Sequence, residues 1–531
     1  MATLDAVLVV FLKASKGGKL VLLSKINSFG LLGIVGYPVS VEIDISGGLP
    51  AFELVGLPDA AVKEARERVR SALKNSGYEY PAQRITVNLA PADMKKEGPL
   101  YDLPMAVGML AAMETLPKEK AEPFCMLGEL SLDGTLRPVS GVLAMAIEAY
   151  KQGYEKMLVP YENATEASYV EGLEVYGCRS LKEAVQFLSG EATIKRQAPI
   201  SWENLPRSAD GYGDFAQIKG QQGAKRAMEI AAAGGHNILL IGPPGTGKTM
   251  LAKALNGILP NMTFEEALEI TKIQSVAGQL RVEGPGMVTQ RPFRAPHHSI
   301  STAALTGGGP KARPGEVSLA HGGVLFLDEL PEFRRDALEA LRQPLEDHQV
   351  TVARVNATAT YPARFMLVAS MNPCPCGQYG TEECRCTPLQ IRRYLNRISG
   401  PLLDRMDLEV EMGAVQYEDI ASQTQEESSE DIKRRVDQAR TLQLKRYGGQ
   451  GIYCNAQLDT RLTKRYCVLD TEGESVMKHA FAQMGLSARA YGRILKVART
   501  IADLEGSESI QVQHVAEAVQ YRSLDRKYWG A

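Results

Sequence analysis

The sequence of 531 residues lacks the features that would mark a membrane-spanning or a highly charged protein. No apolar run approaches the roughly 18 residues that a membrane helix requires, so we expect no membrane partner. Neither sign of charge dominates, because 60 lysines and arginines stand against 62 aspartates and glutamates. This balance excludes a histone-like polycation but permits a local basic surface. Residues 6–12 are apolar, but no basic residue precedes them and no clear cleavage site follows, which argues against a signal peptide.

Cysteine is also scarce. The chain has eight cysteines, and four of them lie within residues 374–386. Few and clustered cysteines are typical of a reducing compartment and not of a disulfide scaffold. We therefore expect a cytoplasmic protein, long enough for about three domains.

The first part of the chain predicts an α/β domain over residues 21–190. Residues 39–45 and 84–89 alternate between apolar and polar side chains, as strands do, and residues 59–75 between them read as helical. Residues 1–20 match no motif and form an uncertain N-terminal extension.

A linker and two further domains follow. Residues 191–212 are polar and contain prolines and glycine, which predicts the linker. A second α/β unit is expected over residues 213–415 and a mainly helical part over residues 416–531, with an exposed acidic join at residues 423–430. The late helix, within residues 486–504, shows one apolar stripe. Its members are Tyr491, Ile494, Leu495, Ala498 and Ile501.

Residues 242–249, GPPGTGKT, form the clearest motif of the chain. A buried strand is expected before it and a helix after it, which is the setting that a phosphate-binding loop requires. In such a loop Lys248 reaches the β and γ phosphates, and the hydroxyl of Thr249 can ligate Mg²⁺. We therefore predict a site for ATP and Mg²⁺. Its loop residues are Gly242, Pro243, Pro244, Gly245, Thr246, Gly247, Lys248 and Thr249.

Two further apolar stretches end in polar residues that suit the same chemistry. Residues 324–327 lead to Asp328, a Mg²⁺ partner, and to Glu329, a base that polarises the attacking water. Residues 365–370 lead to Asn372, whose amide can hold that water or the γ-phosphate. An isolated Asp-Glu pair usually lies in a solvated turn. The expected buried strand directly before Asp328 and Glu329 favours a catalytic role for this pair.

Hydrolysis of ATP also needs positive charge opposite the leaving phosphates. Arg405, within LLDRMD at residues 402–407, and Arg489, at the start of the late helix, are the candidates. The alternative is that both make surface salt bridges, Arg405 with its flanking aspartates. The spacing alone leaves both interpretations open.

Seven longer motifs, taken together, resemble those of AAA+ ATPases, in particular the magnesium-chelatase-like YifB/ComM family. They are PADM (91–94), AAGGHN (232–237), RAPHHS (294–299), RPGEVSLAH (313–321), LDELPEF (327–333), MNPCPCG (371–377) and SGPLLDR (399–405). The resemblance covers about residue 22 to the end. It implies an α/β multidomain fold with three parts. They are a Lon-protease-like (S5 type 2-like) N-terminal domain, an AAA+ P-loop core and a C-terminal helical lid.

The resemblance also implies roles and partners. Asn372 would be sensor 1, Arg405 an arginine finger acting on the neighbouring subunit's ATP, and Arg489 sensor 2. A finger that acts in trans requires a ring, and we expect a homo-hexamer. The described members of the family are helicases that drive branch migration during natural transformation, so we expect an ATP-driven motor on single-stranded or branched DNA. Because the resemblance begins near residue 22, we expect residues 1–20 to be a mis-assigned upstream extension.

Two segments match insertions of this family. Residues 278–316 are glycine-rich and match its helix-2 insertion. This segment carries the cations Arg281, Arg291, Arg294, Lys311 and Arg313. Residues 350–360 alternate like a hairpin and match its pre-sensor-1 hairpin. In related rings both project toward the pore, where cations follow a phosphate backbone without reading sequence. For any single cation a solvated surface position is the alternative. The DNA contacts that we single out are Arg354, Lys311 and Arg313.

The N-terminal domain departs from the Lon proteases that it resembles. Those enzymes pair a serine, in a Gly-Pro-Ser-Ala-Gly setting, with a lysine. This chain has GPLYD at residues 98–102 in place of the serine motif and GVLA at residues 141–144 where the lysine would stand. Acyl transfer requires a nucleophile and a base that activates it, and these positions provide neither. We expect a scaffold or a DNA-binding platform.

The clustered cysteines form two Cys-x-Cys pairs beside Asn372, and Gly377 and Gly380 allow the chain to reverse between them. Four thiolates are enough for a closed tetrahedral Zn²⁺ site, which would brace this loop and leave no open position for catalysis. A redox pair and reduced spectator thiols are the alternatives, because the spacing is tighter than in the usual zinc ribbon. The four candidates are Cys374, Cys376, Cys384 and Cys386.

Three functions therefore compete. The first is a DNA-translocating branch-migration motor, the second a magnesium-chelatase-type motor subunit, and the third an ATP-driven unfoldase or remodelling ATPase. The missing Ser-Lys dyad argues against proteolysis. A chelatase motor subunit would not need the Lon-like domain.

Overall fold

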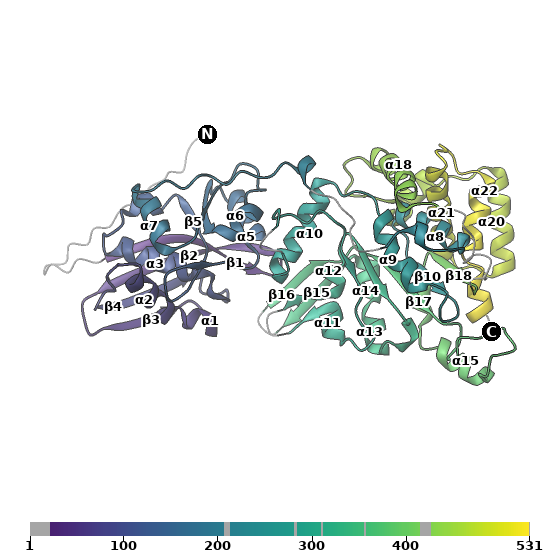
Figure 1. Ribbon diagram of the computed structural model, residues 1–531, viewed down its shortest axis with the longest axis horizontal. Coiled ribbons are helices and arrows are strands. Elements are labelled where there is room, and N and C mark those ends of the chain that lie inside the picture. Colours follow the sequence, from purple (N-terminus) through teal and green to yellow (C-terminus); the bar gives the residue numbers. More distant parts are fainter. Residues whose placement is uncertain are drawn as a thin grey trace. The chain divides into compact units, whose positions relative to one another are not determined.

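The computed structural model describes residues 22–205, 213–280, 284–309, 312–354, 357–414 and 426–529 (Figure 1). The chain forms two compact units. The first comprises residues 1–201 and 278–286, and the second comprises residues 202–277 and 287–531. Residues 1–20, for which we predict an upstream extension, lie outside the described residues.

The first unit contains a seven-stranded mixed sheet in the order β3-β4-β2-β1-β5-β8-β9. Its strands are β1 (Leu22–Leu32), β2 (Val35–Ser46), β3 (Ala51–Val55), β4 (Arg84–Ala90), β5 (Phe124–Met126), β8 (Lys156–Pro160) and β9 (Glu174–Cys178). The predicted strands at residues 39–45 and 84–89 are confirmed, because they lie in β2 and β4. Val39, Val41 and Ile43 are buried on one face of β2 while the residues between them are more exposed, as the period of two requires.

Helices of the first unit surround this sheet, some in direct contact with it and others packed on those helices. They are α1 (Ala60–Lys63), α2 (Ala65–Asn75), α3 (Asp102–Ala112), α4 (Lys118–Ala121), α5 (Val142–Lys151), α6 (Tyr161–Ala167) and α7 (Leu181–Ser189), with a 3-10 turn at Pro99–Tyr101 and the short strands β6 (Glu129–Leu130) and β7 (Leu136–Arg137). The helix expected over residues 59–75 is present but divided at Glu64. Asp59 accepts the N–H of Val62 and caps the first piece.

The second unit contains a five-stranded parallel sheet in the order β11-β14-β17-β10-β18. Its strands are β10 (Ile238–Ile241), β11 (Phe293–Arg294), β14 (Val324–Leu327), β17 (Met366–Met371) and β18 (Leu408–Glu411). All residues of β10, β14 and β17 are buried, which is why these strands are continuous apolar runs in the sequence. In the chain β11 follows β10, but it lies three strands away from it, so the strand order changes direction at β10.

Helices and short elements complete this unit. The helices around the sheet are α8 (Gln222–Gly234), α9 (Lys248–Ile258), α10 (Phe264–Ala277), α11 (Thr302–Thr306), α12 (Glu316–Leu319), α13 (Arg335–Ala340), α14 (Arg342–Asp347), α15 (Pro388–Leu395) and α16 (Gly400–Leu403). The 3-10 turns are Trp202–Asn204, Phe215–Gln217, Leu330–Glu332 and Asn455–Gln457. A two-residue pair joins β12 (Gly307–Gly308) to β13 (Arg313–Pro314), and a hairpin joins β15 (Gln349–Arg354) to β16 (Ala357–Pro362).

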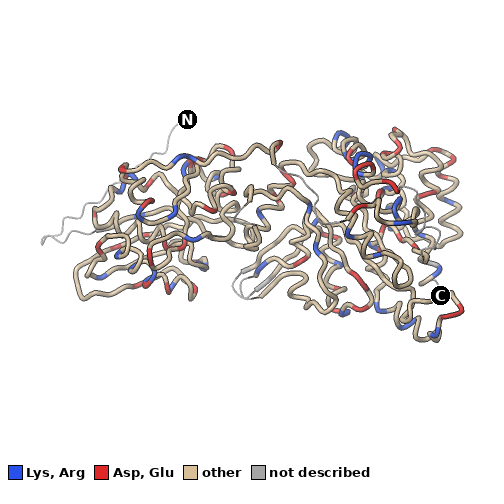
Figure 2. The backbone as a smooth tube through the Cα atoms, in the orientation of Figure 1, with Lys and Arg blue, Asp and Glu red and all other residues tan. Residues whose placement is uncertain are grey.

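The C-terminal part of the second unit is helical, as predicted. Its helices are α18 (Ser429–Tyr447), α19 (Thr460–Tyr466), α20 (Thr471–Met484), α21 (Ala488–Leu504) and α22 (Val512–Gln520), followed by a π-helical turn at Asp525–Trp529. Figure 1 shows α18, α20, α21 and α22 grouped together, and Figure 2 shows both signs of charge interspersed along them. Four of the five residues of the predicted apolar stripe on α21 are buried. Tyr491, the fifth, is 40% exposed, so the stripe begins one turn later than predicted.

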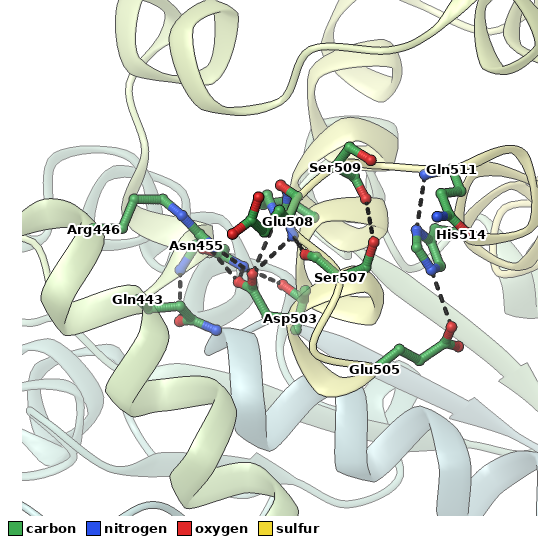
Figure 3. Close-up of polar contacts among 12 residues, drawn as sticks. Gln443, Arg446, Asn455, Asp503, Glu505, Ser507, Glu508, Ser509, Gln511 and His514 are labelled. Atoms are coloured by element: carbon green, nitrogen blue, oxygen red, sulfur yellow. Dashed lines mark hydrogen bonds and ion pairs between the residues drawn. The ribbon is translucent and has the colours of Figure 1, made fainter.

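Asp503 organises the polar interior of these helices (Figure 3). Its fully buried carboxylate pairs with the guanidinium of Arg446 at 2.5 Å and with that of Arg499 at 3.0 Å, and it also accepts an N–H from the Asn455 side chain at 2.9 Å. A buried carboxylate is tolerated where opposite charges and hydrogen bonds compensate for the lost water. Asp503 thus joins α18, α21 and the turn at Asn455–Gln457.

The join expected to be exposed at residues 423–430 is described from Glu426 onward. The carboxylate of Glu426 pairs with Lys225 of α8 at 2.7 Å and accepts the N–H of Gly220, and its side chain is only 15% exposed. The prediction of an exposed join is therefore wrong for Glu426, because its carboxylate is held inside by the buried lysine that it compensates. Among the described residues, no helix combines the length and apolar character needed to cross a membrane.

Candidate nucleotide and metal sites

The strand, loop and helix expected around GPPGTGKT are present. β10 ends at Ile241 and α9 begins at Lys248. Gly245 and Gly247 have φ angles of 80° and 87°, a region that favours glycine. A Cβ atom on Gly242 would lie 2.4 Å from the carbonyl oxygen of Met412, so a side chain there would displace the backbone after β18.

Lys248 points back over the loop. Its Nζ donates to the carbonyl oxygens of Gly242 and Pro243, at 2.7 Å each, and to Oδ1 of Asn372 at 3.2 Å. Burial lowers the pKa of Lys248, and the charges of Asp328 and Glu329 oppose that effect. The ammonium group therefore lies beside the amide for which we predict the sensor 1 role.

The hydroxyl of Thr249 donates to Oδ2 of Asp328 at 2.7 Å. The other carboxylate oxygen of Asp328 accepts the hydroxyl of Ser370 on β17 and the N–H of Glu329 at 3.1 Å. The two residues predicted as Mg²⁺ ligands are thus in direct contact. Ser370 was missed by sequence reasoning, although a lone hydroxyl inside an apolar strand that leads to Asn372 is a usable signal.

Glu329 has a φ of 54°, which is uncommon for a residue other than glycine and is typical of functional positions. Its side chain is 57% exposed, and Oε2 lies 3.7 Å from Nδ1 of His298. His298 follows β11 and contacts the ring of His297, at 4.0 Å between centroids. The sequence placed both histidines in a family motif but assigned them no role.

Arg405 lies at the opposite edge of the sheet. Asn237, directly before β10, donates its side-chain N–H to the carbonyl oxygen of Arg405 at 2.9 Å. The Arg405 guanidinium contacts the carboxylate of Glu346 and donates to the carbonyl oxygen of Pro401 at 2.7 Å. Arg405 therefore makes a salt bridge, as the alternative expects, but with Glu346 of α14 and not with its flanking aspartates.

Arg489 contacts the residue that precedes Arg405. Its side chain is 64% exposed, and Nη1 lies 4.0 Å from Oδ2 of Asp404. Arg489 therefore makes the surface salt bridge that the alternative expects.

The four clustered cysteines converge. All four Sγ atoms lie within 4.8 Å of one another. The separations from Cys374 to Cys376, from Cys376 to Cys384 and from Cys374 to Cys384 are 3.4, 3.8 and 4.0 Å. Tetrahedral zinc with Zn–S bonds of 2.3 Å places its sulfurs about 3.8 Å apart, so the cluster fits that ion. The N–H groups of Gln378 and Arg385, followed by neighbouring thiols, lower the pKa of Cys376 to about 6.

The cysteine loop contacts the phosphate loop. A Cβ atom on Gly377 would lie 2.4 Å from Cδ of Pro244, and Gly377 has a φ of 81°. Only glycine allows this approach without a shift. The cysteine cluster therefore adjoins both Pro244 and the segment that carries Asn372.

The structure describes two of the three cations that we single out for DNA. Arg354 ends β15 opposite Ala357, next to the hairpin turn, as expected. Arg313 is exposed on β13, and Lys311 lies outside the described residues. Two other arginines of the insertion have internal partners: Arg291 binds Glu266 at 2.9 Å and Arg294 binds Glu316 at 2.6 Å.

The positions that correspond to the Lon-type dyad hold no nucleophile and base. Asp102 of the GPLYD motif is buried. Its carboxylate accepts hydrogen bonds from Nε of Arg68 at 2.6 Å and from Nη2 at 3.0 Å. Burial raises the pKa of Asp102 to about 6, although Arg68 opposes this shift. Ala144 is buried within α5. The pair of Arg68 and Asp102 joins α2 to α3 and has a structural role.

Comparison with known proteins places the chain among the magnesium-chelatase-like AAA+ ATPases. The family described as magnesium chelatase, subunit ChlI, matches residues 214–420. Subunit ChlI of Mg-chelatase matches residues 41–163, and the ChlI C-terminal family matches residues 426–522.

Relatives define the family more narrowly. The chain is 48% identical over 506 residues to the uncharacterized protein YifB of Escherichia coli, covering 95% of this chain and 98% of the relative. It is 46% identical over 511 residues to the competence protein ComM of Haemophilus influenzae, with the same coverage. A shorter match, 27% identical over 124 residues, covers 23% of this chain and 22% of Lon protease 2 of Bacillus subtilis. The chain belongs to the YifB/ComM family of magnesium-chelatase-like proteins.

Family membership confirms the resemblance found in the motifs, and the α/β fold agrees with it. It implies an ATPase that uses ATP and Mg²⁺. The exact domain borders and the roles of single residues stay predictions.

We predict that Lys248→Ala abolishes ATP binding, because the ammonium group is the only cation bonded to the loop within the described residues. Glu329→Gln should bind ATP normally and lose about 10²–10⁴-fold in turnover, the usual contribution of a general base. Nucleotide binding and phosphate release are to be measured for both variants. Full hydrolysis by either one would contradict the site assignment.

Proposed function

We propose that this protein is an ATP-hydrolysing motor that acts on DNA as a homo-hexameric ring and promotes branch migration during recombination of incoming DNA. The main support for ATP hydrolysis is that Lys248, Asp328 and Asn372 lie at the same edge of the sheet. The name of a relative, competence protein ComM, supports the link to DNA uptake. The proposed location is the cytoplasm, where free thiols and DNA coexist.

In this proposal each subunit supplies most of one ATP site. Thr249 and Asp328 hold Mg²⁺, Lys248 turns from the loop carbonyls to the β and γ phosphates, and Glu329 polarises the attacking water. The bond from Asn372 to Lys248 supports a sensor role for that amide, since both groups would meet the same γ-phosphate.

Arg405 and Arg489 complete the site of the next subunit in the ring. β10 separates Asn237, which binds the backbone of Arg405, from the phosphate loop. Its four residues span about 13 Å at 3.3 Å each. Arg405 is therefore too far from its own loop to touch the same γ-phosphate, which supports action in trans. Arg489, beside Asp404, would act from the same surface.

DNA would contact the two family insertions. Strand β15 of the hairpin ends at Arg354, and β13 carries the exposed Arg313. Lys311, which is outside the described residues, belongs to the same proposed surface. Such cations bind phosphates without regard to base sequence.

A magnesium-chelatase-type motor subunit or an ATP-driven unfoldase is the alternative. Both would keep the same ATP chemistry and differ in what stimulates it. Hydrolysis that responds to a tetrapyrrole or to a protein client, and not to DNA, would favour them.

We predict about one zinc per chain, held by the closed four-cysteine site. Protein purified without chelators is to be measured by metal analysis. Replacing Cys374 and Cys376 by serine should remove the metal, whereas replacing the separate, buried Cys125 by serine should not. Unmodified protein without zinc would favour the redox interpretation.

The finger role of Arg405 predicts complementation. Arg405→Ala should bind ATP yet lose about 10³-fold or more in hydrolysis, as arginine fingers do. Mixing it with inactive Lys248→Ala protein should restore part of the activity, because a mixed interface contains both an intact Lys248 and an intact Arg405. Arg397→Ala, which removes an exposed arginine paired with Glu332, is the control. Normal hydrolysis by Arg405→Ala would rule out the finger.

Motor activity predicts ATP-dependent displacement of a strand from a three-strand or Holliday-type junction. DNA binding should weaken steeply with salt and depend little on base sequence. Arg354→Ala should lower DNA-stimulated hydrolysis and strand displacement while nucleotide binding stays intact. Arg342→Ala, at an exposed arginine of α14, is the control. A hexamer with ATP and Mg²⁺ that neither binds DNA nor resolves the junction would refute the proposal.

A further inference from the structure

A cavity of about 270 Å³ lies at the amino ends of the strands in the second unit. Asn237, Gly323, Met366 and Asp407, which begin or directly precede β10, β14, β17 and β18, all line it. The phosphate loop follows the other end of β10, and none of residues 242–249 lines the cavity. The cavity is therefore separate from the phosphate loop of its own subunit, although Arg405, the proposed arginine finger, also lines it.

The lining of this cavity is rich in cations. Its positively charged residues are Arg291, Arg364, Arg405, Arg440, Arg493 and Lys496. Three carboxylates also line it, and each already has a partner. Glu266 binds Arg291 at 2.9 Å, Glu269 lies 3.3 Å from His321, and Asp407 lies 3.6 Å from Arg493.

Three lining cations have no carboxylate within 4.0 Å among the described residues: Arg364, Arg440 and Lys496. They donate hydrogen bonds to backbone carbonyl oxygens. Arg440 donates to Ala232 and Ala233 at 3.3 Å each, Lys496 to Ala456 at 3.1 Å, and Arg364 to Gly451 at 3.4 Å. A carbonyl dipole compensates a charge less well than a counter-ion does.

Arg440 is the most informative of these residues. It is only 8% exposed, and its buried Nε has no hydrogen-bond partner among the described residues. A buried guanidinium without a counter-ion is costly, and proteins usually compensate one with an anion. Arg440 lies on α18, binds carbonyl oxygens near the end of α8, and lines the cavity.

Burial acts against the charge of the cations that line the cavity. It lowers the pKa of Lys496, Asp407 opposes this effect, and Arg493 adds a smaller lowering. Burial also lowers the pKa of His348, and the charges of Arg364 and Lys496 add to that effect. Burial is the largest cause in both groups, and a bound anion would compensate the charge that burial disfavours.

We propose that this cavity binds the phosphate group of a small anion between Arg440, Lys496 and Arg364. Guanidinium groups match the geometry of phosphate oxygens, and an ammonium adds a point charge. A cavity of this size admits inorganic phosphate or the phosphate end of a small ester, and not a nucleic-acid strand. The site goes beyond the proposed motor function and does not depend on it.

The test uses the full chain carrying Lys248→Ala, so that the phosphate loop does not contribute. Titration calorimetry with inorganic phosphate, at constant ionic strength kept by chloride, should give one site per chain. A separate titration with adenosine monophosphate distinguishes free phosphate from a phosphate ester, and tighter binding of either one identifies the source.

Adding Lys496→Met or Arg440→Met should weaken binding by about tenfold or more, the usual effect of losing a charged hydrogen bond. Lys445→Met, at an exposed lysine of α18, is the matched control and should bind as the parent does. Lys496→Met keeps the apolar stem and removes a repelled charge, so its thermal midpoint should not fall, while the phosphate-dependent rise in that midpoint should disappear. No binding by the parent, or equal binding by all the variants, would overturn the proposal.

Discussion

Parallel pairing of β10 and β14 with β17 is the constraint on which the candidate ATP site depends. Leu239 pairs with Ala369 and Phe326 pairs with Val368, so the three strands run in register and end at one edge. The residues that follow those ends are far apart in the chain but must meet in space. The bond between Thr249 and Asp328 and the bond between Lys248 and Asn372 are consequences of that register.

The same strands fix a second edge, at their amino ends. Asn237 holds this edge together, because its side chain accepts the N–H of Leu367 at 2.8 Å and donates to the carbonyl oxygen of Arg405. Asp407 accepts the N–H of Asn237 at 3.0 Å. Although burial acts against it, the neighbouring His236 and Arg493 lower the pKa of Asp407 to about 2, so this acid stays charged. One short sheet thus carries the candidate nucleotide loop at one edge and several cations at the other, which is the polarity that the proposed ring of identical subunits would need.

What the sequence predicts well is local. The phosphate loop, its strand and helix, and the Arg354 hairpin follow from motifs whose residues are neighbours in the chain. The partners of the arginines do not. Glu346, which pairs with Arg405, lies on α14, and the bonds of Arg291 to α10 depend on how distant segments fold together. Tyr491 has the right helical spacing for burial but lies where no element covers it fully. The contacts of Ser370 with Asp328 and of His298 with Glu329 join segments that are far apart in the chain, which periodicity does not reveal.

The cysteine loop links the local chemistry to the fold. Its first cysteine lies two residues after Asn372, and its glycine at position 377 packs against Pro244 of the phosphate loop. The loop therefore adjoins both the amide that contacts Lys248 and the backbone that would surround phosphate. Such a loop has no apolar core of its own, because Cys376 and the tip around Thr381 are exposed. Ligation of the proposed zinc by the four sulfurs would supply the restraint that packing does not. On this argument the proposed metal holds the γ-phosphate end of the site in shape, although it takes no part in hydrolysis.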